Sequence, residues 1–486
     1  MKRKVMISVL AISIISVFAA CGFDASDTTN SSKSSSTTTT SNSTSTAAES
    51  TADYKVLDVK TDWDTKATIS FSESGMEIEG SGATDEDGVL YITEGGAYTL
   101  AGSSNACSVV IDTDENVKLI LNGVDLTSVN GPVIYGAEVK NLYIELASKT
   151  ENSLTDSSEY ATDASTGEEI GKGVISCEDD IIILGDGTLN ISSSYKHGIA
   201  SDDKIYIEDG TINITSTGVD GINANDLICI DGGNISIEAE SDIMGSSDML
   251  VINGGTIIGT SKAEGLEAKE SLYINGGTIN ISTEDDGCNA GTYLEINGGD
   301  LTISTSKGDA IDCNGNTDGC IVINGGTVYA IGSSVPEGGI DADNSNVIIN
   351  GGTVIAIGDV NSPIDEASEQ VVIVYGSFNA DETIEIRDSD GNAVFETTPT
   401  VAGNTMIISV PGLESKQTYT IYANGNEKQT VTIDSQVIEA GGSAQGMAGM
   451  GQGGPDMNQG RPEMNGKDPM DGREMPTRKP NTDSNL

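Results

Sequence analysis

Carboxylate side chains recur through the middle of this sequence at intervals of 22 or 23 residues. The first series consists of Asp220, Asp242, Glu264, Asp286 and Asp309. Three residues after four of these positions stand further oxygen-bearing side chains, Asn223, Glu267, Asn289 and Asp312, and Asp341 continues this set. Carboxylate and amide oxygens, without histidine or thiolate, are the ligands that a hard cation such as Ca²⁺ prefers. The sequence therefore predicts a calcium site formed by Glu264, Glu267, Asp286, Asn289, Asp309 and Asp312.

A second acidic series has nearly the same spacing and consists of Asp180, Asp203, Asp226, Asp248 and Glu270. If equivalent residues of successive repeats stack about 4.8 Å apart, neighbouring like charges repel by roughly 1 kcal/mol in water and roughly 3.5 kcal/mol at an effective dielectric constant of about 20. Each series must therefore spread into solvent, keep some carboxyl groups protonated, or bind cations. A solvated acidic face is the alternative to calcium for both series. The nonapeptide pattern of calcium-binding RTX repeats is absent from the sequence.

Groups suited to acid–base or nucleophilic catalysis are scarce. His197 is the only histidine, so Ser-His-Asp and Cys-His chemistry have little support. Lys262 and Lys307 alternate with glutamates from one repeat to the next, so we expect both in cross-strand ion pairs. Lys269 is the remaining candidate for a proton-abstracting base. We therefore expect a non-catalytic protein, and a lyase that uses Lys269 beside calcium is the alternative.

The elements that hold these series are short strands in a repeat of about 22 residues. Residues 264–299 show an alternating apolar strand, Asn-Gly-Gly, a second alternating strand and an acidic turn. The second glycine of each pair falls at Gly187, Gly210, Gly233, Gly255, Gly277, Gly299, Gly326 and Gly352. A fixed period in this range, with strands and no helical spacing, indicates a solenoid. We predict an all-β protein, a parallel β-helix whose rungs contain 22–23 residues.

Aligned repeats predict ladders of equivalent residues. One inward ladder is Ile207, Ile230, Ile252, Ile274, Ile296, Ile323 and Ile349, and a second is Ile212, Ile235, Ile257, Ile279, Leu301, Val328 and Val354. A column of small residues marks a tight corner at Ser201, Ala224, Ser246, Ala268, Ala290, Cys313 and Ala342. The asparagines before the glycine pairs are expected to bond to one another along the stack rather than to a sugar.

Composition narrows the range of partners. The chain carries 75 Asp and Glu against 24 Lys and Arg, a formal charge of −51. This balance argues against binding to nucleic acid and to anionic membrane surfaces. An acidic ligand would need cations between it and the protein. Aromatic residues make up only 4% of the chain, so a broad aromatic platform for sugars is not expected.

The ends of the chain predict a tethered surface protein. Residues 1–21 have the layout of a secretory signal that ends in a lipoprotein-type Cys21, where we expect an acyl anchor. Residues 22–53 are a Ser/Thr-rich linker and 441–486 a disordered tail. Between them we expect a β-helix over 54–370 and a small β-sandwich-like module over 371–440. The predicted location is the outer face of a bacterial membrane, contacted through the lipid only, and we expect a monomer.

Several phrases of the sequence resemble a known family. They are VKLILNGVDL, GPVIYGAEVKNLYIELASKTENSL and CEDDIIILGDGTLNISSSYKHGIASDDKIYIEDGTINITS. Residues 54–440 resemble the clostridial cell-surface carbohydrate-binding proteins, a right-handed parallel β-helix family. The resemblance implies polysaccharide binding, calcium on the helix and similarity to calcium-dependent pectate lyases. The acidic turns at Asp179-Asp180, Asp202-Asp203, Asp220, Asp286 and Asp309 match that family, whereas Glu267 and Asn289 stand where a lyase-type site would need aspartates.

Three functional hypotheses follow from the sequence. The leading one is a calcium-loaded surface lipoprotein that binds a plant or cell-wall polysaccharide, including acidic polymers such as polygalacturonate bridged by the cation. The second is a calcium-dependent pectate lyase. The third is a passive adhesin or spacer whose acidic columns are only solvated. The sequence leaves open whether Cys313 and Cys320 form a disulfide.

Overall fold

The computed structural model describes residues 59–441 except 165–166, 318, 334–335 and 344. Cys21, the predicted signal and linker, and all but the first residue of the predicted tail lie outside the described residues. Every regular element in the described part is a β-strand. That part contains no helix long and apolar enough to cross a membrane. The prediction of an all-β protein is confirmed.

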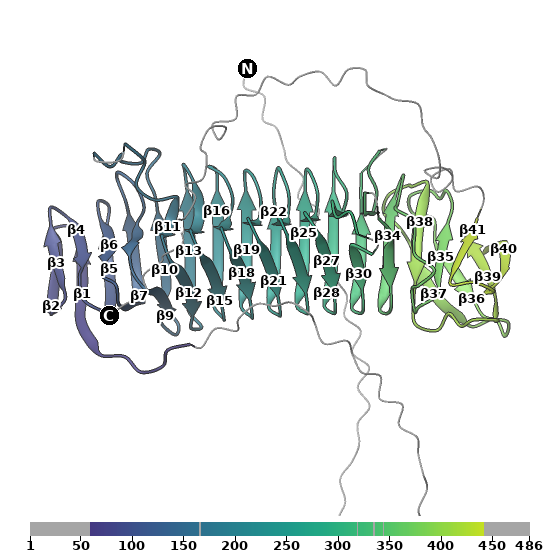
Figure 1. Cartoon of the computed structure of the whole chain (residues 1–486), viewed down its shortest axis with the longest axis horizontal. Helices are drawn as coiled ribbons and strands as arrows, with labels where there is room; N and C mark the ends of the chain where they lie inside the picture. The colour runs from purple at the N-terminus through teal and green to yellow at the C-terminus, as the bar shows by residue number, and fades with distance from the viewer. Residues whose placement is uncertain (1–58, 165–166, 318, 334–335, 344, 442–486) are drawn as a thin grey trace, which may run out of the picture. The chain divides into compact units, whose positions relative to one another are not determined.

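The chain winds into stacked rungs, each built from up to three strands that pair in parallel with their equivalents in the next rung (Figure 1). The first face is a 12-stranded sheet formed by β3 (Ala83–Glu86), β4 (Val89–Ile92), β6 (Ser108–Asp112), β8 (Ile134–Glu138), β11 (Gly173–Cys177), β14 (His197–Ser201), β17 (Ile222–Ala224), β20 (Met244–Ser246), β23 (Leu266–Ala268), β26 (Cys288–Ala290), β29 (Ile311–Cys313) and β32 (Ile340–Asp341). We call it the short-strand face.

The other two faces belong to one 25-stranded sheet. One set of strands comes before the turn that reads Asn-Gly-Gly in the later, regular rungs. These strands are β9 (Asn141–Leu146), β12 (Asp180–Leu184), β15 (Lys204–Ile207), β18 (Leu227–Ile230), β21 (Met249–Ile252), β24 (Ser271–Ile274), β27 (Tyr293–Ile296), β30 (Ile321–Ile323) and β33 (Val347–Ile349). The strands after the turns are β10 (Glu151–Thr155), β13 (Thr188–Ser193), β16 (Thr211–Ser216), β19 (Asn234–Ala239), β22 (Thr256–Thr260), β25 (Thr278–Thr283), β28 (Asp300–Thr305), β31 (Thr327–Ile331) and β34 (Thr353–Gly358).

The predicted ladders are confirmed by the strand register. Ile252 pairs with Ile274, and Ile257 pairs with Ile279, so both isoleucine columns fill the interior. Asn275 donates its amide to Asn253 at 2.8 Å and accepts from Asn297 at 2.9 Å, as the amide ladder requires. The asparagine column therefore has a structural role.

The glycine pair at each turn is required by the close approach of successive rungs. Gly277 has a φ of +92°, a conformation that side chains rarely adopt. A Cβ added at Gly276 would lie only 2.7 Å from the carbonyl oxygen of Asn253 in the preceding rung. The two glycines thus allow rungs to turn at the normal strand spacing.

The first rungs lie before the regular repeats. β1 (Thr65–Ser72), β5 (Gly96–Ser104) and β7 (Asn116–Thr127) pair in parallel, and β2 (Gly75–Gly80) folds back on β1 as a hairpin. Trp63 lies beside this end, with its ring centroid 4.9 Å from that of Tyr143. Tyr143 begins an outward column that is nevertheless buried and forms a cluster of its own with Tyr206, Val251 and Tyr273.

The parallel stack ends where the chain reverses direction. β38 (Thr405–Ser409) pairs antiparallel with β34 and with β35 (Val372–Tyr375). β35 also pairs in parallel with β41 (Val437–Ala440). A separate four-stranded sheet contains β36 (Ile384–Arg387), β37 (Ala393–Thr397), β39 (Thr418–Ala423) and β40 (Asn426–Thr432). One hydrophobic cluster joins residues of both sheets, so the predicted sandwich-like appendage is present, and its first sheet continues the solenoid.

Candidate functional site

Two acidic columns run along the short-strand face. The turn before each strand carries the first series, because Asp242 stacks on Asp220 and Asp309 on Asp286 in the observed register. The middle outward position of the strands forms a second column, which we call the outer column. In chain order it contains Asn223, Gly245, Glu267, Asn289, Asp312 and Asp341. The strand geometry thus brings side chains three residues apart in sequence onto one corner.

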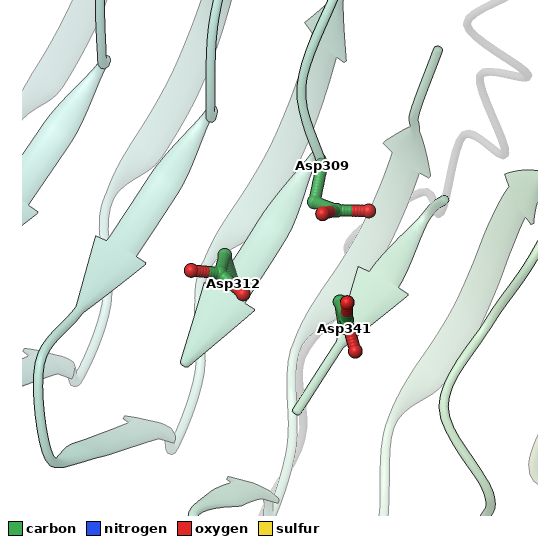
Figure 2. A group of neighbouring side chains, drawn as sticks. All are labelled: Asp309, Asp312 and Asp341. Carbon is green, nitrogen blue, oxygen red and sulfur yellow. The ribbon is translucent and has the colours of Figure 1, made fainter. Parts of the chain in front are cut away.

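Three carboxylates converge at the C-terminal part of this corner. Asp309 lies in the turn before β29, Asp312 on β29 and Asp341 on the neighbouring strand β32 (Figure 2). Each offers an oxygen, and these atoms lie within 4.8 Å of one another. We call these three residues the carboxylate cluster. Asp309 is only 5% exposed and Asp312 only 7% exposed, so water cannot fully solvate their charges.

The hydrogen bonds that the structure shows for the carboxylate cluster come from uncharged donors. The backbone N–H of Gly338 donates to Asp309, and the side chain of Asn314 donates to Asp312 at 2.8 Å. Asp341 accepts from the hydroxyl of Ser362 at 2.6 Å and from the backbone N–H of Asp343 at 3.0 Å. Burial nevertheless raises the pKa of Asp309 to about 9, with Glu337 and Asp341 adding to the shift. Burial together with the charges of Asp286 and Asp341 raises the pKa of Asp312 to about 8. Within the described part of the chain, no ion pair involves Asp309, Asp312 or Asp341, so their ionised forms need a positive partner from outside.

Asp242 and its acidic neighbours form a second group on the same corner, on the N-terminal side of the carboxylate cluster. Burial, Asp220 and Glu264 raise the pKa of Asp242 to about 9. Burial acts on Asp220 in the same direction, but contacts with His197, the backbone of Asp242 and Asn223 outweigh it and lower its pKa. His197 lies one rung earlier in this column, with Nδ1 3.2 Å from an Asp220 carboxylate oxygen. His197 is therefore a corner residue that contacts Asp220.

The four other predicted calcium ligands lie in the rungs between Asp242 and the carboxylate cluster. Asp286 accepts hydrogen bonds from the backbone of Asp309 at 2.8 Å and from the side chain of Asn289 at 2.9 Å. Glu264 donates its backbone N–H to Asp242 at 3.1 Å, and Glu267 is ion-paired. The structure thus brings Asp309 and Asp312 together with Asp341. Glu264, Glu267, Asp286 and Asn289 line the adjoining rungs.

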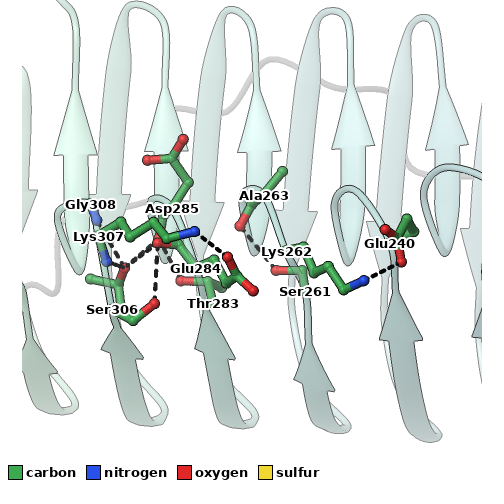
Figure 3. Close-up of polar contacts among 11 residues, drawn as sticks. Glu240, Ser261, Lys262, Ala263, Thr283, Glu284, Asp285, Ser306, Lys307 and Gly308 are labelled. Atoms are coloured by element: carbon green, nitrogen blue, oxygen red, sulfur yellow. Dashed lines mark hydrogen bonds and ion pairs between the residues drawn. The ribbon is translucent and has the colours of Figure 1, made fainter.

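The lysines near the corner are engaged in ion pairs. Lys262 pairs with Glu240 at 2.6 Å, and Lys307 pairs with Glu284 (Figure 3). Both pairs were predicted from the alternating charges.

Lys269, the candidate base, is ion-paired as well. Its amine contacts Glu267, which comes from the same strand region. Burial lowers the pKa of Lys269, but Glu267, Glu264 and Asp242 outweigh that effect and raise it. An amine with a raised pKa is protonated at neutral pH and is a poor proton acceptor. The geometry therefore gives Lys269 the role of a counter-ion.

The second acidic series follows the predicted register with one correction. Asp203, Asp226, Asp248 and Glu270 stack in successive rungs. Asp180 does not lie in this column, because Ile181 pairs with Ile205 and places Asp180 opposite Lys204. The rung at this point contains 24 residues, so Asp179 is the one that stacks on Asp203. One oxygen of Asp180 is buried without a hydrogen-bond partner, and burial raises its pKa.

Asp341 was not among the predicted calcium ligands. It stands in the outer column, but an insertion puts it 29 residues after Asp312 rather than 22 or 23. Its signal was its position after Gly339-Ile340, which is equivalent to Ala310-Ile311 before Asp312. Cys313, next to Asp312, and Cys320 are buried free thiols, with the Cys320 sulfur 3.6 Å from the Cys313 carbonyl oxygen.

Comparisons with known proteins add a family and a relative. The family described as "Carbohydrate-binding domain-containing protein" matches residues 86–284 and 243–450. A protein of the same description from Acetivibrio thermocellus is 28% identical over 141 residues, which cover 28% of this chain and 49% of that protein. The match therefore spans about half of that relative's length. A solved structure titled as a polysaccharide lyase-like protein from C. thermocellum, gadolinium derivative, covers 51% of this chain and 95% of its own, with 25% identity and a TM-score of 0.43.

Proposed function

This chain belongs to the carbohydrate-binding domain-containing protein family, and we propose that it binds polysaccharide through calcium held on its short-strand face. The observation that carries the calcium part is the carboxylate cluster. Three carboxylate oxygens converge within 4.8 Å, and two of the three side chains are almost fully buried. A divalent cation with oxygen ligands would displace the protons and stabilise the ionised form of these carboxylates.

The cation also explains how so acidic a protein would hold a glycan. At a formal charge of −51, the surface repels an acidic polymer unless a cation stands between them. Calcium usually takes six to eight oxygen ligands. Three aspartates leave coordination positions for water and for a sugar carboxylate. The substrate class that fits is therefore an acidic polysaccharide such as polygalacturonate, bound without cleavage because Lys269 is tied to Glu267.

The location proposed for this activity is the cell surface. The sequence of residues 1–21 supports export and acylation at Cys21, and residues 22–53 would tether the β-helix away from the membrane. The membrane contact is then the lipid alone, and the binding unit is a single chain.

Calorimetry tests the proposal. The full chain is titrated with an oligogalacturonide in calcium buffer, and the titration is repeated with a chelator. We expect a saturable heat in calcium that disappears in chelator. Heat that is equal under both conditions would refute the role of calcium, and continuing heat with the release of unsaturated products would replace binding by lyase activity.

A further inference from the structure

A concave surface lies on the short-strand face, at its N-terminal end. It is a pocket of about 290 Å³ over the beginnings of β4, β6 and β8. Its floor consists of Tyr91, Val110 and Tyr135, which stack in register in three successive rungs. Its sides include Val129, Pro132 and Ile170. We call this the tyrosine pocket.

The strand register relates the tyrosine pocket to the carboxylate cluster. Tyr135 pairs with Ser176 in the next rung, and the same outward column continues through Ala200 and Asn223 to Asp312. The floor is thus the outer column of the first rungs. Seven rung spacings of about 4.8 Å separate Tyr135 from Asp312, a distance of about 34 Å.

The insertion between β10 and β11 separates the two places. Its last residues fold over the face, and the backbone N–H of Lys172 donates to Ser176 at 2.9 Å. Ser176 is buried as a result, and Ile170 of the same insertion forms one wall of the tyrosine pocket. The pocket is therefore a bounded site of its own rather than part of a continuous groove.

The rim of the tyrosine pocket exposes apolar surface to solvent. Val129, on the rim, is 67% exposed, the largest value among the exposed large hydrophobic side chains of residues 59–441 outside the gaps. The rim is nevertheless held firmly. The N–H of Gly131 donates to Ser157 at 2.9 Å, and Ser108 donates to the carbonyl of Pro132 at 2.9 Å. A preformed apolar hollow with a few polar groups is the usual form of a small-ligand site.

Tyr135, one of the two aromatic residues of the floor, is held in orientation by a hydrogen bond. The hydroxyl of Tyr135 donates to Glu178 at 2.9 Å, which leaves the ring face available while the polar tip is satisfied. No lysine or arginine lines the pocket, and its only charged lining residue is Asp87. An anionic sugar has no partner here. A neutral pyranose with axial C–H groups on its faces can pack on the tyrosine rings and donate a hydroxyl to Asp87.

We propose that the tyrosine pocket is a calcium-independent subsite for a neutral β-linked glycan, separate from the calcium-dependent site for acidic polymers. The proposal rests on the carbohydrate-binding function proposed above and adds a second ligand class to it. The family match includes the whole pocket, since it begins at residue 86 and runs through the insertion. A chain with both sites could hold two different polymers of one cell wall.

The test uses the full chain and cellohexaose in buffer with a chelator, by calorimetry. Wild-type protein should bind saturably. Tyr91→Ala and Tyr135→Ala should each weaken binding at least tenfold, because a stacking face is lost. Tyr135→Phe keeps the ring and should stay within threefold of wild type. Ile258→Ala is the matched control, because Ile258 is an exposed apolar residue on a different face.

Val129→Glu tests the pocket even if the tyrosine variants fail to fold. Its side chain is exposed, so the fold should tolerate the charge, while a carboxylate on the rim should weaken cellohexaose binding tenfold. Absence of saturable binding by the wild type, or unchanged affinity in Tyr91→Ala and Val129→Glu, would overturn the proposal. Oligogalacturonide binding in calcium, measured in parallel, separates the two claims: its persistence would leave the proposed function standing while the tyrosine pocket is rejected.

Discussion

At the scale of single residues, the chain holds acidic groups where ionisation is unfavourable without a cation. Asp309 and Asp312 are buried together, and their pKa values are raised mainly by burial, with repulsion from neighbouring carboxylates adding to the shift. The residue types and the corner could be derived from the sequence. The grouping of three residues could not, because an insertion of unknown path separates Asp312 from Asp341.

The first prediction concerns calcium and stability. Wild-type protein should unfold at a higher temperature in calcium than in chelator, since a ligand at a hundredfold excess over its Kd adds about 2.7 kcal/mol. Asp312→Asn should lose most of this increase, because it removes one carboxylate from the cluster. Asp300→Asn, at an exposed position on β28, should keep it. Equal calcium effects in both variants would place the ion elsewhere.

The second prediction concerns Lys269. Its side chain is 63% exposed, so the ion pair with Glu267 should contribute no more than about 1 kcal/mol. Lys269→Ala should therefore change the unfolding free energy by about that amount or less. Glycan affinity by calorimetry should stay within threefold of wild type. If Lys269→Ala instead abolished release of unsaturated sugar from polygalacturonate, Lys269 would be a catalytic base after all.

At the scale of elements, the rung is the unit that the sequence specifies best. A constant period forces isoleucines, small residues and asparagines into columns, so these positions could be predicted without coordinates. Asp180 fell outside its predicted column because one rung contains 24 residues, and no local signal distinguishes a longer turn from a longer strand. The tyrosine pocket could not be predicted from the repeat period, because Tyr91 and Tyr135 lie in rungs whose lengths differ from the regular repeat.

The third prediction tests the amide ladder. Asn275 both donates to Asn253 and accepts from Asn297, so Asn275→Ala leaves unpaired groups on both sides. The loss should cost about 1–3 kcal/mol of unfolding free energy. Asn280→Ala, on the exposed side of β25, should cost clearly less. Denaturant unfolding measures both, and equal losses would argue that the ladder has no special role.

At the scale of the whole molecule, the large negative charge and the buried carboxyl groups predict how stability depends on pH. In chelator, Asp242 and Asp309 titrate at about 9 in the folded chain, far above their ordinary value of 3.8. Between these limits the folded state binds more protons than the unfolded state, so stability falls as the pH rises. The unfolding temperature in chelator should therefore fall from pH 5 to pH 8.

Calcium should reduce this dependence, because bound cations favour the ionised carboxylates. Circular dichroism melting curves at pH 5, 6, 7 and 8, with calcium and with chelator, measure both effects. An unfolding temperature that rises or stays constant over this range in chelator would show that the carboxyl groups are not protonated in the folded state.

Calorimetric titration of oligogalacturonide into the Asp309→Asn/Asp312→Asn double variant and into Asp300→Asn, both in calcium at neutral pH, determines whether the carboxylate cluster supports glycan binding. We expect saturable binding by Asp300→Asn and at least a tenfold loss of affinity in the double variant, with both proteins folded. Equal affinity in the two variants would contradict the proposal that the carboxylate cluster holds the calcium that binds the glycan.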